Sequence, residues 1–376
     1  MVAIASKRVL PPRTRALTLG AVIALAPTLA ACRPDTDGGA ALVDSPRVLA
    51  IRSEPAEAVP GKPVAYRALY VGPSEELDST SLDWALCLAR KPIAVAGSIA
   101  LECLQLEADA GAGTGTDSEV KADVLAPLGN GLSAMGTLPK DGCRVFGPSP
   151  PAPKAGEPAA RPADPDSSGG YYQALRVRVP QTPSEYAIGF TRIACGLGSA
   201  TQEQALDYGK RYRDNQNPEI DAVVVDPDGD ALALSESENF ATPIRARAKL
   251  TLRVRWADCP LDAACGDGVC TPSDDRDACP EDCAAPVGCT GSEPYVYLDP
   301  IERRLVERRE SMRVSWFTTA GSFEHDRSGR SEAEATNPFS ENRFSAPSAA
   351  GTVRLWVVLR DDRGGVGYKS FYARVE

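Results

Sequence analysis

Residues 352–368 read TVRLWVVLRDDRGGVGY, and their pattern indicates two strands joined by a turn. Four alternate residues from Val353 to Leu359 are apolar, while the opposite face carries arginines at both ends. A period of two is typical of a β-strand with one buried face. The next five residues, DDRGG at 361–365, favour a tight turn, after which the chain continues into a last strand. The stretch therefore predicts a β-hairpin.

The same alternation recurs in both halves of the chain. In the second half, KLTLRVRW at 249–256 and MRVSW at 312–316 place apolar residues at alternate positions. In the first half, LDWALCL at 82–88 and LRVRV at 175–179 do the same, and an apolar stretch follows at 186–195. Each of these segments predicts a strand, and most have one side facing solvent.

The first half begins with the strand order of an immunoglobulin-like domain. Residues 46–71 predict two strands split by PGKP at 60–63, where turn residues stand at the expected reversal. The strand at 82–88 follows, with Trp84 expected to point inward. Strand, turn, strand and then a buried Trp is the order found at the start of immunoglobulin-like sandwiches.

We therefore predict an all-β fold of two immunoglobulin-like β-sandwich domains, with one short linking helix and a disulfide-rich insert in the second domain. The predicted segments are a first domain at 46–199 with low-complexity insertions at 107–119 and 147–170, a helical linker at 200–217, and a second domain at 218–376 with a cysteine-rich insert at 259–289. The low-complexity insertions consist largely of small and polar residues, so neither can bury a core.

The linker contains the signals of a helix start. Thr201 can cap a helix, with Gln204 at the capping-box position. Ala205, Tyr208 and Tyr212 would then share one face. We expect one helix here, ending before the NQNP sequence that precedes the second domain.

The first 31 residues have the composition of a secretion signal. Residues 1–15 carry four basic and no acidic side chains, and the apolar run ALTLGAVIALA follows at 16–26. Eleven helical residues reach about 16 Å, roughly half of a bilayer core, so this run is too short to span a membrane. It predicts a cleaved signal peptide at 1–31.

LAAC at 29–32 resembles the lipobox of bacterial lipoproteins, in which the cysteine thiol receives a diacylglycerol. This resemblance implies a lipid on Cys32, a place in the bacterial cell envelope and a tether at 32–45. By the same resemblance Arg33, a residue other than Asp, favours the outer membrane. The alternative is an ordinary secretory signal followed by an incidental cysteine.

Charge argues against nucleic acid as a partner. The formal net charge is −10, and it becomes −14 without residues 1–31, which hold four basic and no acidic residues. An acidic surface repels phosphate backbones, and no basic stripe with interleaved aromatic residues stands out. The expected partners are the membrane, through the lipid on Cys32, and an unidentified protein or glycan.

Eleven cysteines are present, and ten remain when Cys32 is set aside. Export places them in an oxidising compartment, where disulfides are expected. Zinc is the alternative, but the one histidine, His325, lies away from the cysteines in sequence. The disulfide candidates are Cys87, Cys103, Cys143, Cys195, Cys259, Cys265, Cys270, Cys279, Cys283 and Cys289.

Two pairs of cysteines are plausible partners, although the connectivity of all ten is not deducible from sequence. Cys143 and Cys195 can tie the second insertion to the strands after it. Cys87 and Cys103 are close enough in sequence to join neighbouring strands.

The cysteine-rich insert contains CGDGVCTPSDDRDACPEDC at 265–283. So short an insert cannot form a hydrophobic core, and disulfides are expected to replace one. The stretch resembles a cysteine-rich motif of secreted myxobacterial proteins. One interpretation is a disulfide knot alone. The other adds calcium, with the carboxylates of Asp267, Asp274 and Asp277 as hard oxygen donors. No other cofactor is expected.

Two further features resemble sites without meeting their requirements. DPDGD at 226–230 has the one-three-five spacing of an EF-hand loop and resembles turns of cadherin-like domains, yet the Gly and Glu that an EF-hand requires later in its loop are missing. A plain Asx-rich turn is the simpler interpretation. His325 stands beside Asp326 and near Ser328, but the residues of a catalytic triad converge from separate elements. We interpret His325 as a solvated loop residue.

Longer stretches resemble known families. VSWFTTAGSF at 314–323 and the segment 344–368 are similar to the C, F and G strands of bacterial immunoglobulin-like domains related to the PKD and cadherin-like groups. That resemblance implies a fold and a spacer or binding role, not an activity. PRVLAIRSEPAEAVPGKPV at 46–64, with CLARKP beyond it, resembles the N-terminal part of uncharacterised myxobacterial lipoproteins, which implies no function.

We expect a non-catalytic, membrane-anchored envelope lipoprotein that serves as a binding, adhesion or structural surface module. The sequence contains no G-x-S-x-G, phosphate-loop or G-x-G-x-x-G motif. Two alternatives stay open. One is a surface hydrolase that acts on carbohydrate or peptide through carboxylates, and the other is an accessory lipoprotein subunit of an envelope secretion or motility complex.

Overall fold

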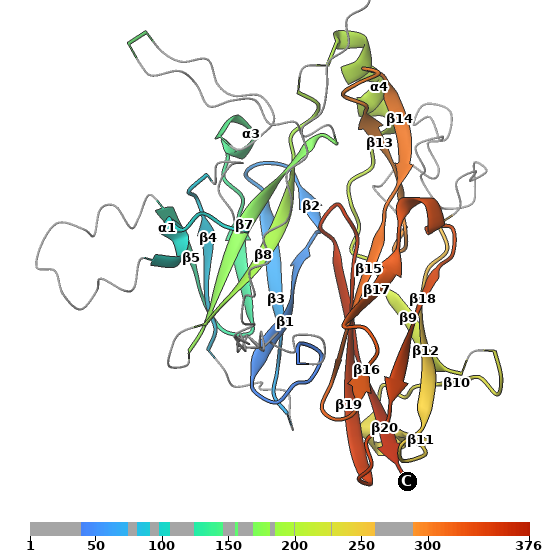
Figure 1. Ribbon diagram of the computed structural model, residues 1–376. Coiled ribbons are helices and arrows are strands. Elements are labelled where there is room, and N and C mark those ends of the chain that lie inside the picture. The colour runs from blue at the N-terminus through green and yellow to red at the C-terminus, as the bar shows by residue number, and fades with distance from the viewer. Residues whose placement is uncertain are drawn as a thin grey trace, which may run out of the picture. The chain divides into compact units, whose positions relative to one another are not determined.

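β-Strands dominate the computed structural model, which confirms the all-β prediction (Figure 1). The structure describes residues 39–73, 81–90, 98–105, 124–145, 155–156, 168–180, 185–198, 200–226, 228–259 and 289–376. The strands form two pairs of facing sheets and a separate hairpin.

The first sandwich encloses one core between two sheets. One sheet has the order β1–β3–β6, with β1 at Arg47–Glu54, β3 at Pro63–Val71 and β6 at Ser133–Thr137. The other has the order β2–β8–β7–β4–β5, with β2 at Glu57–Ala58, β8 at Glu185–Ala194, β7 at Gly170–Val179, β4 at Asp83–Cys87 and β5 at Leu125–Asn130. Trp84 points inward as predicted: it is fully buried, and its Nε1 donates to the carbonyl of Gly131 at 2.7 Å.

The second sandwich is built in the same way. One sheet has the order β10–β9–β12–β18–β16, with β10 at Leu232–Ala233, β9 at Ile220–Val225, β12 at Lys249–Trp256, β18 at Phe339–Ser345 and β16 at Ser322–Phe323. The other has the order β11–β20–β19–β15–β17, with β11 at Thr242–Ile244, β20 at Val366–Val375, β19 at Gly351–Arg360, β15 at Met312–Thr318 and β17 at Arg327–Arg330. Trp256 and Trp316 fill its core.

The hairpin predicted from residues 352–368 is present. β19 and β20 pair antiparallel over ten positions, from Arg360 opposite Val366 to Gly351 opposite Val375. The predicted turn at 361–365 joins them. The alternating apolar residues of β19 lie in the core of the second sandwich, because successive side chains of a strand point to opposite faces.

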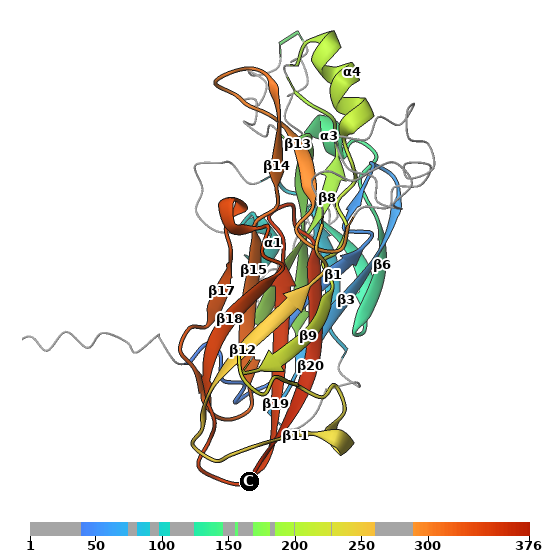
Figure 2. The ribbon, with the colours of Figure 1, turned by 90° about the vertical axis from the view of Figure 1, so that its right-hand side faces the viewer.

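The predicted linking helix is α4, at Gln202–Arg211 (Figure 2). Its Thr201 cap and Gln204 form the expected capping box. Tyr208 and Tyr212 are buried with their ring centroids 4.7 Å apart, whereas Ala205 is exposed. The tyrosines pack on the hairpin of β13 (Pro294–Leu298) and β14 (Leu305–Arg309), which the sequence patterns did not reveal.

The remaining elements are single turns. They are α1 at Glu102–Gln105, α3 at Gly142–Val145, and the 3₁₀ turns η1 at Glu238–Phe240 and η2 at Glu332–Glu334. Among the described residues, no helix is both long enough and apolar enough to cross a membrane.

Both sandwiches contribute to a third apolar cluster. Leu49 and Leu69 of the first sandwich pack with Trp356 and Val358, which lie on the face of β19 opposite to its core. Val43 joins the same cluster. The last part of the predicted tether at 32–45 is therefore built into the folded body, where the Val43 amide donates to the carbonyl of Thr318 at 2.9 Å.

Candidate functional site

Within the described residues, three disulfides join six of the ten candidate cysteines. Cys87 pairs with Cys103 and Cys143 pairs with Cys195, as the spacing suggested, with Cα atoms 5.7 and 5.2 Å apart. Cys259 pairs with Cys289 across the ends of the cysteine-rich insert. The predicted sites that lie outside the described residues are Cys32, Cys265, Cys270, Cys279 and Cys283, and the calcium candidates Asp267, Asp274 and Asp277.

Two aspartates of the DPDGD segment bind groups of the neighbouring strand β12. The Asp226 carboxylate accepts a hydrogen bond from the Thr251 amide at 2.9 Å, and Asp226 itself has a positive φ of 45°. Asp228 forms an ion pair with Arg253 at 3.2 Å. Within the described parts of the chain, no group of three or more His, Cys, Asp or Glu side chains is placed to hold a metal ion.

His325 is exposed, in agreement with its interpretation as a loop residue. Its neighbour Ser328 accepts a hydrogen bond from Nε1 of Trp316 at 2.9 Å and lies 2.9 Å from the hydroxyl of Ser340. The Ser328 hydroxyl thus supports a core tryptophan, and among the described residues no hydrogen bond joins it to His325.

A buried ionic network centres on Arg363, which stands in the turn between β19 and β20. Arg363 is 1% exposed. Its Nε donates to Glu310 at 2.6 Å, one terminal nitrogen donates to Glu293 at 2.5 Å, and the other donates to the carbonyl of Arg213 at 2.9 Å. The turn thereby binds both the segment after α4 and the ends of the β13–β14 hairpin.

A second buried ion pair adjoins the first network. Glu57 of β2 and Arg192 of β8 lie 3.2 Å apart with fully buried side chains. The Tyr212 hydroxyl donates to the Glu57 carboxylate, with O–O distances of 2.5 and 2.6 Å, and the Asn215 amide donates to it at 2.9 Å. Because Tyr212 also lies 6.0 Å from the Arg363 guanidinium, measured to its ring centroid, the two networks meet at the end of α4.

Burial shifts the acidic groups of the Arg363 network toward their neutral forms. It raises the pKa of Glu293 to about 7 and that of Asp361 to about 6, although Arg363 acts in the opposite direction on both. Burial raises the pKa of Glu310 well above its ordinary value, again against Arg363. One guanidinium thus faces three buried carboxyl groups, and the folded protein holds protons that these groups would release in water.

These shifts predict a stability maximum on the acidic side of neutrality. A carboxyl group with a raised pKa binds more protons in the folded than in the unfolded state, so stability falls as pH rises between about pH 4 and pH 7. We expect the free energy of unfolding in urea, with disulfides intact, to be lower at pH 8 than at pH 5 by about 2 kcal/mol or more. Glu293→Gln should flatten this slope, whereas Asp221→Asn, at an exposed position, should leave it unchanged. A stability that rises from pH 5 to pH 8 would contradict the prediction.

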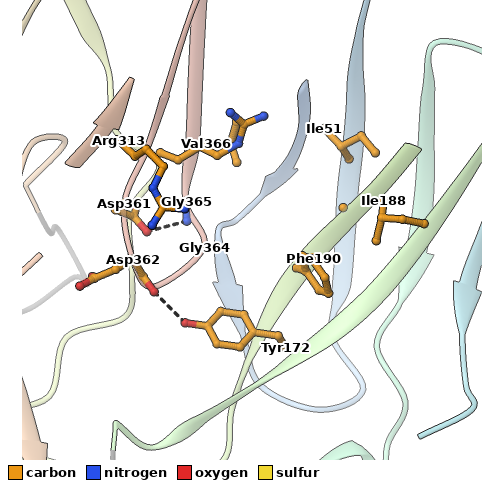
Figure 3. A pocket seen from close by; sticks show the side chains of 12 residues that line it. Ile51, Tyr172, Ile188, Phe190, Arg313, Asp361, Asp362, Gly364, Gly365 and Val366 are labelled. Carbon is orange, nitrogen blue, oxygen red and sulfur yellow. Dashed lines mark hydrogen bonds between the residues drawn. The ribbon is translucent and has the colours of Figure 1, made fainter. Parts of the chain in front are cut away.

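A cavity of about 400 Å³ borders the same turn (Figure 3). Ile51, Ile188 and Phe190 form its apolar side, and Tyr172 reaches across to donate to the main-chain carbonyl of Asp362 at 3.0 Å. The sequence did not reveal this cavity, because its lining comes from strands far apart in the chain.

Two carboxylates border the cavity, and both have other partners. Asp361 accepts hydrogen bonds from the Gly365 amide at 2.8 Å and from the Asn215 side chain at 3.2 Å. Asp362 accepts from the amide and the hydroxyl of Ser311 at 3.4 and 3.3 Å. The pair consists of consecutive residues engaged on separate groups, which is not the arrangement of two carboxylates that face each other across a substrate.

Comparisons with known proteins do not assign this chain to a family. No protein-family model matches it, and no curated protein matches it. Activated α-2-macroglobulin of Escherichia coli is similar at a TM-score of 0.19 and 9% identity, over 89% of this chain and 22% of that one. The C-terminal domain of the Streptococcus pyogenes antigen I/II-family protein AspA is similar at a TM-score of 0.21 and 7% identity, over 88% of this chain and 99% of that one. Dimeric latent PorU from Porphyromonas gingivalis is similar at a TM-score of 0.19 and 9% identity, over 89% of this chain and 34% of that one. At these TM-scores the matches carry no argument about fold or function.

Proposed function

We propose that this chain is a non-catalytic lipoprotein of the bacterial cell envelope, anchored through a lipid on Cys32, whose two β-sandwiches present a binding surface to a protein or glycan. The signal-like residues 1–31 and the LAAC lipobox resemblance support the anchor. The disulfides support an oxidising compartment, since paired cysteines are the expected state there. The outer membrane is the proposed destination because Arg33 follows the cysteine.

The Arg363 network is the observation that carries the non-catalytic assignment. Strongly shifted pKa values often mark active sites, but ion-pair networks inside a protein shift them as well. Glu293 and Glu310 are almost fully buried, and both carboxylates bind Arg363. A general acid or base must reach a substrate within hydrogen-bond distance, and these groups are closed from solvent. The network supports a rigid connection between parts of the fold rather than chemistry.

The hydrolase alternative gains no support from the cavity near the turn. Asp361 and Asp362 are adjacent in sequence, and each already accepts hydrogen bonds from protein groups.

The third alternative, a subunit of an envelope secretion or motility complex, differs from our proposal only in the partner. Crosslinking in living cells followed by mass spectrometry separates the two, since a single dominant envelope partner favours the complex subunit.

Replacing the lipidated cysteine tests the anchor. Cys32→Ser is expected to move the protein from the membrane fraction to the fraction that a high-salt wash releases, because a lipid anchor gains about 0.8 kcal/mol per buried CH₂ and serine cannot carry it. The high-salt wash also removes weak electrostatic attachment. Arg33→Ser, which keeps Cys32, is the matched control and should stay in the membrane fraction. Retention of Cys32→Ser in washed membranes would refute the lipid anchor.

A further inference from the structure

Three arginines line a cavity on the face of the second sandwich that points away from its core and toward Leu49 of the first sandwich. The cavity has a volume of about 870 Å³, and Arg313, Arg327 and Arg360 are among its lining residues. Arg313 stands opposite Arg360 on the neighbouring strand, and Ser315 stands opposite Arg327 on the other side. Since Met312 and Val314 face the core, Arg313 and Ser315 lie on the face of β15 that points away from it. Three neighbouring strands therefore bring three guanidinium groups to one surface.

No ion pair neutralises this cluster within the described part of the chain. Like charges directly opposite each other on paired strands are destabilising. Among the described residues, no carboxylate lies within ion-pair distance of Arg313, Arg327 or Arg360. Burial, together with Arg327 and Arg313, lowers the pKa of Arg360 to about 10, which leaves it charged at neutral pH. An anion in the cavity would relieve this repulsion.

The guanidinium of Arg360 also keeps donors available. It donates to the carbonyl of Leu49 at 3.0 Å and to the Ser315 hydroxyl at 3.4 Å. A guanidinium has five N–H donors in a planar fork that matches the oxygens of phosphate or carboxylate. The two contacts hold Arg360 in place and leave further N–H groups for a ligand.

Two acidic residues, Glu324 and Asp326, also line the cavity. Glu324 pairs with Arg343 at 3.5 Å. Asp326 acts on Arg47 only through its charge, which raises the pKa of Arg47 against the lowering effect of burial, and the buried Oδ1 of Asp326 has no hydrogen-bond partner among the described residues. Three guanidinium groups therefore line the cavity with two carboxylates, which leaves its lining positive although the whole chain has a negative net charge.

The cavity lies close to the start of the folded body. Ala40 lines it, and the Arg47 guanidinium donates to the carbonyl of Ala40 at 2.8 Å. Only eight peptide units separate Ala40 from Cys32, and an extended chain spans at most about 3.5 Å per residue, or about 28 Å in all. A lipid on Cys32 would therefore keep the arginine cavity near the membrane surface.

We propose that the arginine cavity binds a phosphate group, and that this group belongs to the headgroup of an anionic lipid in the anchoring membrane. The lipid source rests on the proposed function, because it needs the anchor at Cys32. The phosphate site does not, since it depends only on Arg313, Arg327 and Arg360. Charge-assisted bonds between arginine and phosphate are among the strong hydrogen bonds of proteins. Such a contact would fix the orientation of the sandwiches on the membrane.

The test uses the full chain with Cys32→Ser, so that no lipid anchor contributes. Inorganic phosphate is titrated by calorimetry, and cosedimentation is measured with phosphatidylcholine vesicles that either lack or contain phosphatidylglycerol. In the double variant Arg313→Gln/Arg327→Gln, both of whose positions are exposed, we expect both responses to weaken by about tenfold or more. Arg255→Gln/Arg374→Gln is the matched control, because it also removes two charges, both from exposed positions that do not line the cavity.

Each result decides one part of the proposal. Binding of phosphate and of anionic vesicles, both weakened only in Arg313→Gln/Arg327→Gln, supports both parts. Phosphate binding without vesicle binding overturns the lipid source and assigns the site to free phosphate. Equal binding by Arg313→Gln/Arg327→Gln and by the control Arg255→Gln/Arg374→Gln overturns the site. Membrane retention of Cys32→Ser in washed cells would contradict the anchor alone and leave the phosphate titration unaffected.

Discussion

Arg363→Met is expected to lower the free energy of unfolding by about 3–5 kcal/mol at pH 7.5, because it leaves buried carboxylates without their cation. Arg363 is the one cation that contacts both Glu293 and Glu310 among the described residues, at 2.5 and 2.6 Å. Methionine keeps much of the side-chain volume but neither the charge nor the donors. The loss also removes the bond to the carbonyl of Arg213, which connects the turn to the segment after α4.

The effect of Arg363→Met should depend on pH in a way that a simple packing defect would not. Burial raises the pKa of Glu293 to about 7, so this group is mostly neutral at pH 5 and needs its cation less there. We expect the destabilisation to be smaller at pH 5 than at pH 7.5, measured by urea unfolding with tryptophan fluorescence. A loss of the same size at both pH values would show that the charge of Arg363 is not what matters.

Two further variants test the same argument. Arg374→Met changes an exposed arginine of β20 and should alter stability by no more than about 0.5 kcal/mol. Adding Glu293→Gln and Glu310→Gln to Arg363→Met removes the buried charges together, and should restore part of the lost stability. If the triple variant is less stable than Arg363→Met, the carboxylates contribute more than their charge.

The sequence predicted many of the strands because the alternation of apolar and polar residues within a strand shows which of its faces is buried. The alternation at 249–256, 312–316 and 352–360 corresponds to β12, β15 and β19. The capping box of α4 was visible for the same reason, since its two residues are three positions apart. The β13–β14 hairpin was missed, although PYVYL at 294–298 is rich in the aromatic and β-branched residues of strands.

The candidate sites could not be predicted in the same way. DDRGG at 361–365 has the composition of an exposed turn, yet its arginine is 1% exposed. The two carboxylates that bind Arg363 stand 53 and 70 positions earlier, and no local pattern connects residues so far apart. The three arginines of the proposed phosphate site likewise come from separate strands, so they do not form a basic cluster in the sequence.

One signal in β19 does point beyond its own sandwich. Trp356 and Val358 are apolar on the face that alternation assigns to solvent. In the structure both are buried against Leu49 and Leu69 of the first sandwich. A strand that is apolar on both faces is typical of a sheet covered on both sides. The contact between the sandwiches was therefore partly visible in the sequence, although its partner was not.

Removal of the Cys143–Cys195 disulfide is expected to lower the free energy of unfolding by about 4 kcal/mol. The bond joins residues 52 positions apart, and a cross-link that closes a long segment limits the freedom of the unfolded chain. In the folded protein it connects α3, a single turn, to the end of β8. So short a helix is only marginally stable without such a constraint.

The double variant Cys143→Ala/Cys195→Ala measures this effect by urea unfolding under non-reducing conditions. Each single variant, with its free thiol blocked, should match the double variant within about 0.5 kcal/mol, because any of the three changes breaks the same bond. Both cysteines are only half-buried, so loss of their sulfur atoms from the core contributes little. If the double variant loses less than about 1 kcal/mol, the segment between the two cysteines gains little freedom when the bond is broken, which would contradict the prediction.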